Sequence, residues 1–524
     1  MPARTTSRRE FIRRAASGAA ALSLAGTLLA LSAGGQSGDR PNIVLIMADD
    51  LGYGDLGCFG AELINTPNID ALAAGGVTFT DAHAPASLCT PTRYSVLTGR
   101  YCWRSPLKSG VLQGYDPLLI DTARPTIASL LKGAGYQTAC IGKWHLGLGA
   151  DKPVDYAQRL SPGPGELGFD YFFGIPASLD MPPYCWVENE NVVGSLSLPK
   201  KPFNTLQREG PMTPGWRDEE VGPTLVRKAE RFIDSCARNN PDDPFFLYLP
   251  YQAPHTPCTP PDFIEGRSRA GVRGDMVAEL DWAVGRITEA LGQHGLDDNT
   301  LLIVTSDNGA LTTGPQSWEG DPPEKYDLAH NGHLPNGHLR GQKADVWDGG
   351  HREPLIAHWP GRIEGGRTSG KLFCLTDLMA TVAAAAGVEL PADAGEDSFC
   401  QLPAMTGEAP DGAVRESVVH HSGAGMFSLR QGKWKLVLGR GSGGFSSPQL
   451  VEPAGDDPRG QLYDMSTDQP ELTNLWAEQP EVVSAMLASL EEIVSRGRST
   501  PGPRQTNDGA VDIWAGATNK VEVP

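Results

Sequence analysis

The feature that most constrains the fold is a set of four short apolar runs, which are separated by segments with helical periodicity. The runs cover residues 42–47, 136–141, 245–249 and 300–305. Short runs of this kind are typical of strands that are covered on both faces, as in a parallel sheet flanked by helices. We therefore expect an α/β fold with a large, mostly parallel sheet.

Helical patterns fill the spaces between these runs. Shorter helices are expected near residues 126–132 and 376–386, and the second of these closes a catalytic domain over residues 37–390. Two longer helices are expected from apolar faces that comprise Leu225, Ala229, Phe232, Ile233 and Cys236, and Met276, Leu280, Val284, Ile287 and Leu291.

Polar side chains follow each of the four strands. The carboxyl ends of parallel strands meet at one edge of the sheet, where open α/β sheets bind ligands. Polar residues after a single strand could arise by chance, but polar residues after all four strands favour an active site. The side chains in question are Asp49, Asp50, Lys143, His145, His255, Asp307 and Asn308.

Cys89 stands at the predicted start of a further helix. Pro91 suits a first helical turn, and Tyr94, Val96 and Leu97 supply an apolar side. A reactive group at a helix N-terminus faces free N–H groups and a partial positive charge, which attract anions. The alternative is a buried, inert thiol.

After Gly387 the alternation of apolar runs and helical segments ends. Residues 427–430 and 434–438 flank Gln431-Gly432-Lys433 and indicate a hairpin, and residues 481–496 indicate a final helix. We expect residues 391–524 to form a smaller subdomain with an antiparallel sheet and one helix. The Gly/Ser-rich segment 439–447 is expected to be a mobile loop.

The N-terminus has the pattern of a twin-arginine export signal over residues 1–36. Arg8 and Arg9 precede an apolar stretch from Ala15 to Ala33. An uncleaved membrane anchor is the alternative, although the stretch is only weakly hydrophobic and no other stretch is long enough to span a bilayer. We expect a bacterial protein that is exported by the twin-arginine machinery and is periplasmic or secreted.

Net charge and cysteine content exclude several classes of protein. Removal of residues 1–36, which carry five arginines and one glutamate, takes the net charge from −19 to −23. Such an acidic body repels nucleic acid and anionic membranes, so an anionic substrate would need a local basic pocket. The nine cysteines form no C-x-x-C pairs, which argues against a zinc site or a disulfide framework but leaves room for one or two bridges.

Seven short motifs follow one another along the chain. They are Asp49-Asp50, C-T-P-T-R at 89–93, L-T-G-R at 97–100, G-K-W-H-L-G at 142–147, H-T-P at 255–257, D-N-G at 307–309, and Lys343 before D-G-G at 348–350. In this order they resemble the type I, formylglycine-dependent sulfatases of the alkaline-phosphatase-like superfamily, which include the arylsulfatases. The resemblance covers roughly residues 41–480.

The resemblance implies that Cys89 does not act as a thiol. In the family, a formylglycine-generating maturation enzyme oxidises this cysteine to an aldehyde in the unfolded chain. The hydrated aldehyde carries two hydroxyls, one to attack sulfur and one to drive out sulfate. A single hydroxyl would leave a sulfate ester that is hard to hydrolyse.

The resemblance also implies roles for the other motif residues. Asp49, Asp50, Asp307 and Asn308 are hard oxygen ligands that suit Ca²⁺, or Mg²⁺ less comfortably, with residue 89 completing the shell. Arg93 would hold the hydrated aldehyde, Lys143 would bind residue 89 and a sulfate oxygen, and His145 would deprotonate the second hydroxyl. His255 and Lys343 would contact the departing oxygen, and one of them would act as general acid.

Substrate choice is less constrained by sequence. Export and a rich loop complement point to a sulfated glycan, with small aryl sulfates as test substrates. Two alternatives stay open: a phosphomonoester or phosphonate ester hydrolase of the same fold, and a non-catalytic protein that binds sulfated glycans. Side chains that we consider for the pocket mouth are His330, His333, His338, Arg340, Trp103, Trp186 and Trp318, together with the wall segment 175–183.

Overall fold

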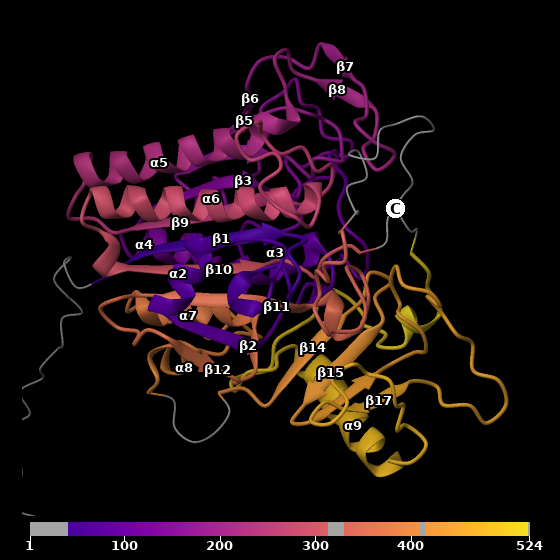
Figure 1. The fold of residues 1–524 in the computed structure, drawn as a ribbon. Coiled ribbons are helices and arrows are strands. Elements are labelled where there is room, and N and C mark those ends of the chain that lie inside the picture. Colours follow the sequence, from indigo (N-terminus) through magenta and orange to yellow (C-terminus); the bar gives the residue numbers. More distant parts are fainter. Residues whose placement is uncertain (1–39, 313–329, 409–413, 522–524) are drawn as a thin grey trace, which may run out of the picture. The chain divides into compact units, whose positions relative to one another are not determined.

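A computed structural model describes residues 40–312, 330–408 and 414–521, and the predicted export signal lies outside these residues. The described chain is built on an 11-stranded sheet (Figure 1). Along the sheet the strands follow the order β12 (Arg367–Ser369), β2 (Val77–His83), β11 (Arg352–His358), β10 (Thr300–Ser306), β1 (Asn42–Asp49), β9 (Phe245–Pro254), β3 (Gln137–Lys143), β4 (Tyr171–Ile175), β5 (Val187–Glu188) and β6 (Asn191–Val192), and β13 (Phe373–Cys374) pairs with β2.

The four predicted strands are neighbours in the middle of this sheet. β10, β1, β9 and β3 pair in parallel, and β4 continues the parallel series. β11 is antiparallel to both β10 and β2. The expectation of a mostly parallel sheet is confirmed, and the carboxyl ends of β10, β1, β9 and β3 lie along one edge.

The apolar side chains of β1 alternate between two hydrophobic cores, one on each face of the sheet. Ile43, Leu45 and Met47 join one core, whereas Val44 and Ile46 join the other. This burial on both faces explains why the run is continuously apolar.

Helices cover both faces. The core that contains Ile43 is completed by α3 (Cys89–Thr98), α4 (Ile127–Gly133) and α7 (Leu378–Ala385). The opposite core is completed by α2 (Pro67–Gly75), α5 (Val221–Asn239) and α6 (Val272–Gln293), of which α5 and α6 run side by side in Figure 1. The predicted helix at 376–386 is divided into a 3₁₀ turn, Leu375–Asp377, and α7.

A separate four-stranded antiparallel sheet follows. It consists of β14 (Ser417–His421), β15 (Phe427–Gln431), β16 (Trp434–Val437) and β17 (Gln461–Asp464), and α9 (Pro480–Arg496) packs against it. The predicted hairpin and final helix are thus present. The short α8 (Leu402–Thr406) instead packs on the core of the large sheet, and β7 (Leu198–Lys200) pairs with β8 (Gly210–Met212).

The expectation of a mobile loop at 439–447 is wrong. Residues 441–444 are buried, and Ser442 and Gly443 form backbone hydrogen bonds with Val346 and Ala424. A Cβ atom on Gly444 would lie 2.3 Å from the backbone of Ala344, so glycine here permits close packing rather than mobility.

No helix among the described residues is long and apolar enough to cross a membrane.

Candidate active site

The ends of the four central strands bring the predicted residues together. β1 ends at Asp49, and Asp50 follows with a φ of 63°. β3 ends at Lys143, two residues before His145, whose φ is 55°. Both left-handed residues turn the chain sharply at the strand end, a strained conformation typical of functional sites.

Cys89 is the first residue of α3 and is 3% exposed. Its Sγ lies 3.2 Å from Nδ1 of His145, and the hydroxyl of Thr90 donates to the carbonyl of His145 at 3.1 Å. The helix start is therefore fixed directly against the end of β3. No side chain caps this N-terminus, which leaves the positive end of the helix dipole beside residue 89.

Buried oxygen atoms converge beside Cys89. One oxygen each of Asp49 and Asp307 and the Sγ of Cys89 all lie within 4.8 Å of one another, as do ligand atoms of Asp49, Asp50 and His255. Oδ1 of Asp49 and Oδ1 of Asn308 are buried without a hydrogen-bond partner. Orphaned oxygens among carboxylates fit a hard divalent cation.

Three cations compensate these carboxylates. Nζ of Lys143 donates to Asp49 at 2.6 Å, and Nζ of Lys343 donates to Asp50 at 2.8 Å. Arg93 donates from Nε and Nη2 to Oδ2 of Asp307, at 3.0 and 2.7 Å. The local basic pocket that the acidic body requires is therefore present.

The pKa values of Asp49 and Asp307 are shifted in opposite directions. Burial alone would raise the pKa of Asp49, but Lys143, His255 and Arg93 hold it below its usual range. Burial and the charge of Asp49 raise the pKa of Asp307 well above its usual range. Two adjacent buried negative charges are unfavourable, and a divalent cation between them would relieve this conflict.

The hydrogen bonds of the two histidines indicate their tautomers. Nε2 of His145 lies 2.8 Å from the carbonyl of Leu112, so this nitrogen carries the proton and Nδ1 presents a lone pair to residue 89. Burial, Lys143 and Arg93 lower the pKa of His145 to about 3, which keeps the ring neutral.

In His255 the other ring nitrogen, Nδ1, contacts a backbone carbonyl. Its Nδ1 contacts the carbonyl of Thr256 at 2.5 Å, and its Nε2 lies 3.0 Å from Nζ of Lys343. Burial and Lys343 lower the pKa of His255, whereas Asp50 raises the pKa of Lys343 despite its burial. The lysine is therefore the charged member of this pair.

Sequence reasoning did not single out Ser178, although it lay within the proposed wall segment. Its hydroxyl contacts Nζ of Lys143 at 3.0 Å and the ring of His255 at 3.3 Å. Ser178 follows β4, which pairs in parallel with β3. Recognition of residues 171–175 as a further strand would have placed Ser178 at the same sheet edge.

A buried network supports Asp50 from the side of α6. Arg273 donates to the carbonyl of Asp50 at 2.8 Å and to both carboxylate oxygens of Asp55. His333, which we expected at the pocket mouth, is buried instead and its Nε2 lies 2.8 Å from Asp55.

The three tryptophans that were considered for the pocket mouth are not shown to line it. Trp103 is completely buried and stacks on Tyr101, so its predicted contact with a sugar is wrong. Trp186 stacks on Phe173 with ring centroids 4.9 Å apart. Trp318 lies outside the described residues.

His330, His338 and Arg340 precede Lys343 in the chain. His330 is partly buried, whereas His338 contacts Gln469 at 3.0 Å. The guanidinium of Arg340 lies 3.6 Å from the ring centroid of Trp347.

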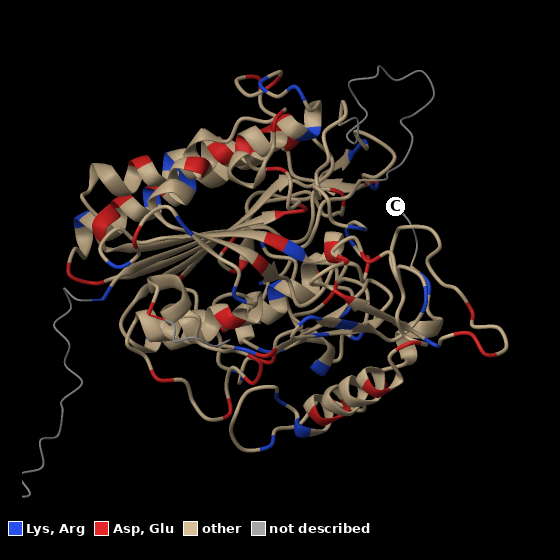
Figure 2. Ribbon diagram, turned by 60° about the horizontal axis from the view of Figure 1, so that its bottom comes forward, with Lys and Arg blue, Asp and Glu red and all other residues tan. Residues whose placement is uncertain are grey.

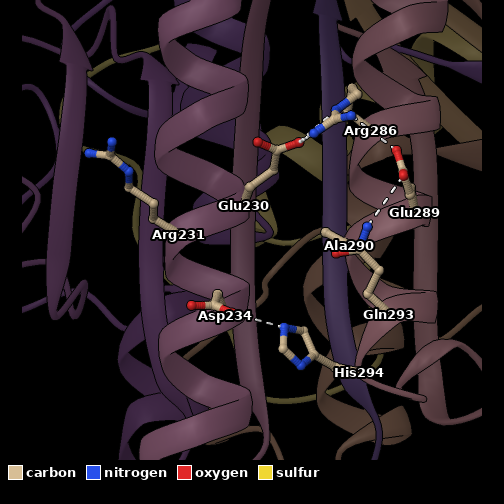
Figure 3. A pocket seen from close by; sticks show the side chains of 8 residues that line it. All are labelled: Glu230, Arg231, Asp234, Arg286, Glu289, Ala290, Gln293 and His294. Atoms are coloured by element: carbon tan, nitrogen blue, oxygen red, sulfur yellow. Dashed lines mark hydrogen bonds and ion pairs between the residues drawn. The ribbon is translucent and has the colours of Figure 1, made fainter.

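A hollow of about 230 Å³ between α5 and α6 is unrelated to this cluster. Figure 3 shows its lining residues, and Figure 2 shows acidic and basic positions interspersed along the long helices. The charges pair with one another: Arg286 binds Glu230 at 2.6 Å, and His294 contacts Asp234 at 3.1 Å. These pairs leave little unbalanced charge to recruit an ionic ligand.

Comparison with known proteins agrees with this arrangement. Residues 41–388 match the family model described as Sulfatase. The chain is 37% identical to an N-acetylgalactosamine-6-O-sulfatase of Bacteroides thetaiotaomicron, over 88% of this chain and 94% of that protein. It is 36% identical to human arylsulfatase A, over 88% of this chain and 89% of that protein.

Solved structures show the same fold. One described under the metabolism of multiple glycosaminoglycans by Bacteroides thetaiotaomicron aligns with a TM-score of 0.75 and 34% identity, over 87% of this chain and 99% of that one. A phosphonate monoester hydrolase of Agrobacterium radiobacter, at 18% identity and a TM-score of 0.58 over 87% of this chain and 96% of that one, shares the fold alone. The chain belongs to the sulfatase family and is a sulfuric ester hydrolase.

Proposed function

We propose that this sulfatase removes the 6-O-sulfate from N-acetylgalactosamine residues of a sulfated glycan. The relative with 37% identity along 94% of its length is an N-acetylgalactosamine-6-O-sulfatase, which supports this choice of sugar and position. The catalytic part is supported by the convergence of the Sγ of Cys89 and one carboxylate oxygen each of Asp49 and Asp307, which lie within 4.8 Å of one another.

Residue 89 is the nucleophile in this proposal, after a maturation enzyme has converted its thiol to formylglycine. The hydrated aldehyde supplies two hydroxyls on one carbon, one for attack on sulfur and one for release of sulfate. Nδ1 of His145 is placed to accept a proton from residue 89, because its lone pair faces Sγ at 3.2 Å and its other nitrogen is held by Leu112. The lowered pKa of His145 keeps that lone pair available at neutral pH.

Lys343 and His255 serve the leaving oxygen. The ammonium of Lys343 contacts Nε2 of His255 at 3.0 Å, so a proton given up by one can be replaced from the other. Arg93 would hold the hydrated aldehyde, and Lys143 would bind residue 89 and a sulfate oxygen. Nη1 of Arg93 donates to the carbonyl of Lys143 at 3.0 Å, which fixes the two residues relative to each other.

Asp49, Asp50, Asp307 and Asn308 would hold Ca²⁺ together with residue 89. The donors are oxygen atoms, and two of them lack any hydrogen-bond partner. The cation would neutralise the carboxylates and polarise the sulfate group.

A panel of substrates tests the proposal. The matured protein is assayed on N-acetylgalactosamine 6-sulfate, N-acetylgalactosamine 4-sulfate, galactose 6-sulfate, nitrophenyl sulfate and nitrophenyl phosphate. We expect kcat/KM on N-acetylgalactosamine 6-sulfate to exceed each other value by at least about tenfold. A preference for the 4-sulfate would overturn the substrate, and dominant hydrolysis of the phosphate would favour the phosphomonoester or phosphonate alternative.

We also propose that residues 1–36 direct twin-arginine export to the periplasm or beyond. Arg8-Arg9 followed by a weakly apolar stretch supports this route. Replacement of both arginines with lysine should retain the protein in the cytoplasm, and unchanged export would contradict it.

A further inference from the structure

Three buried histidines form a cluster that the reaction does not use. His83 is the last residue of β2, His351 directly precedes β11, and His420 lies in β14 of the small sheet. None of the three is exposed to solvent, and one ring nitrogen of each lies within 4.8 Å of the others. The cluster therefore joins the large sheet to the small one.

Each ring has one nitrogen beside a hydrogen-bond acceptor. Nε2 of His83 lies 3.0 Å from the carboxylate of Asp81, and Nε2 of His351 lies 3.1 Å from the carbonyl of Val346. Nδ1 of His420 lies 3.2 Å from the carbonyl of Ala84. A carbonyl or carboxylate only accepts, so these three nitrogens would carry the ring protons.

The remaining nitrogens, which are Nδ1 of His83, Nδ1 of His351 and Nε2 of His420, then carry lone pairs. Nδ1 of His83 and Nδ1 of His351 are 3.2 Å apart, and Nε2 of His420 is buried without any partner. Two nitrogens bound tetrahedrally to one ion at about 2.0–2.1 Å are separated by roughly 3.3 Å. Histidine ligands of metals generally donate their second nitrogen to a carboxylate or carbonyl, as all three would here.

A hydrogen-bonded arrangement without an ion is the competing explanation. Nζ of Lys435 lies 3.2 Å from Nε2 of His351 and also binds Asp348 and Glu471, at 2.7 and 2.8 Å. If Lys435 donates to His351, the opposite nitrogen of that ring can donate to His83. This arrangement leaves the carbonyl of Val346 facing a lone pair and gives no partner to Nε2 of His420.

Two of the three rings are held in the neutral form. Burial and Lys435 lower the pKa of His351 well below its usual value, and burial and His351 do the same for His420. Metal ligation requires neutral imidazole, so no proton has to be displaced from these rings.

We propose that His83, His351 and His420 bind a divalent transition metal, with zinc as the best match to three imidazoles, at a structural site that fastens the small sheet to the large one. The rings of His351 and His420 stack with centroids 3.9 Å apart and an angle of 15°. An ion in the plane of both rings would draw His420 out of this stack. A fourth position would be left for water or a neighbouring oxygen.

Metal analysis tests the site in the full-length protein. Wild-type protein, His420→Gln and His421→Gln are dialysed against micromolar zinc with excess calcium, which we expect to occupy the acidic cluster, and zinc is then measured by mass spectrometry. His421 is the matched control, because it is the next residue of β14, is 2% exposed and has no place in the cluster. We expect about one zinc per chain in the wild type and in His421→Gln, and an affinity at least about a hundredfold weaker in His420→Gln.

Crystallography of the zinc-loaded wild type keeps the test decisive if a variant fails to fold. An anomalous peak between the three rings at the zinc edge supports the site. The proposal is overturned if the crystal structure shows no zinc and His83 and His351 in direct contact. It is also overturned if His420→Gln and His421→Gln bind zinc with equal affinity.

Discussion

Replacement of Cys89 with serine is expected to lower kcat/KM for nitrophenyl sulfate by at least about a thousandfold. Serine nearly matches the buried thiol in size and retains one hydroxyl beside Nδ1 of His145, so the fold should survive. One hydroxyl can accept sulfate but offers no second hydroxyl to expel it. The variant should therefore accumulate a covalent adduct about 80 Da heavier, visible in an intact-mass spectrum.

Cys102→Ser is the matched control for this experiment. Cys102 is equally buried, and its Sγ already contacts a hydroxyl, that of Ser105, at 3.6 Å. It should keep activity within about twofold of the wild type. Cys89→Ser activity within tenfold of the wild type would remove residue 89 from the nucleophile role.

Removal of divalent cations is expected to lower activity by at least about a hundredfold, and calcium alone should restore it. Without a cation, Asp49, Asp50 and Asp307 face an incoming sulfate anion. They also hold the side chains that should bind it: Lys143 lies 2.6 Å from Asp49, and Lys343 lies 2.8 Å from Asp50. A cation on these carboxylates would release the lysines toward substrate.

Titration with calcium and magnesium after chelation provides the measurement. Calcium should restore activity at lower concentration than magnesium, because irregular oxygen sites suit its flexible coordination better. Asp307→Asn should require more calcium than the wild type for half-maximal activity. Full activity in protein shown to contain no divalent ion would refute the metal's part in catalysis.

The central strands and their ends were predictable for a physical reason. β1 is buried on both faces, so its run from Ile43 to Met47 is continuously apolar and easily recognised. Parallel pairing then requires Asp49 and Asp307 to emerge at the same edge. Their roles in catalysis stay predictions until the variants are assayed.

Other features depend on tertiary contacts that no local pattern records. Segment 439–447 has a loop composition, yet Gly444 permits close packing against the backbone of Ala344. Trp103 lies in a core with Tyr101 and Phe427, which the sequence around it does not indicate. The three clustered histidines come from segments far apart in the chain, and each is unremarkable in its own surroundings.

The mass of the peptide that contains residue 89 is the most direct test of the account. The protein is co-expressed with a formylglycine-generating enzyme, digested and analysed alongside its activity. We expect this peptide to be about 18 Da lighter than its cysteine form and to react with aldehyde probes, in proportion to sulfatase activity. Full sulfatase activity in protein whose residue 89 is entirely an unmodified thiol would contradict the account.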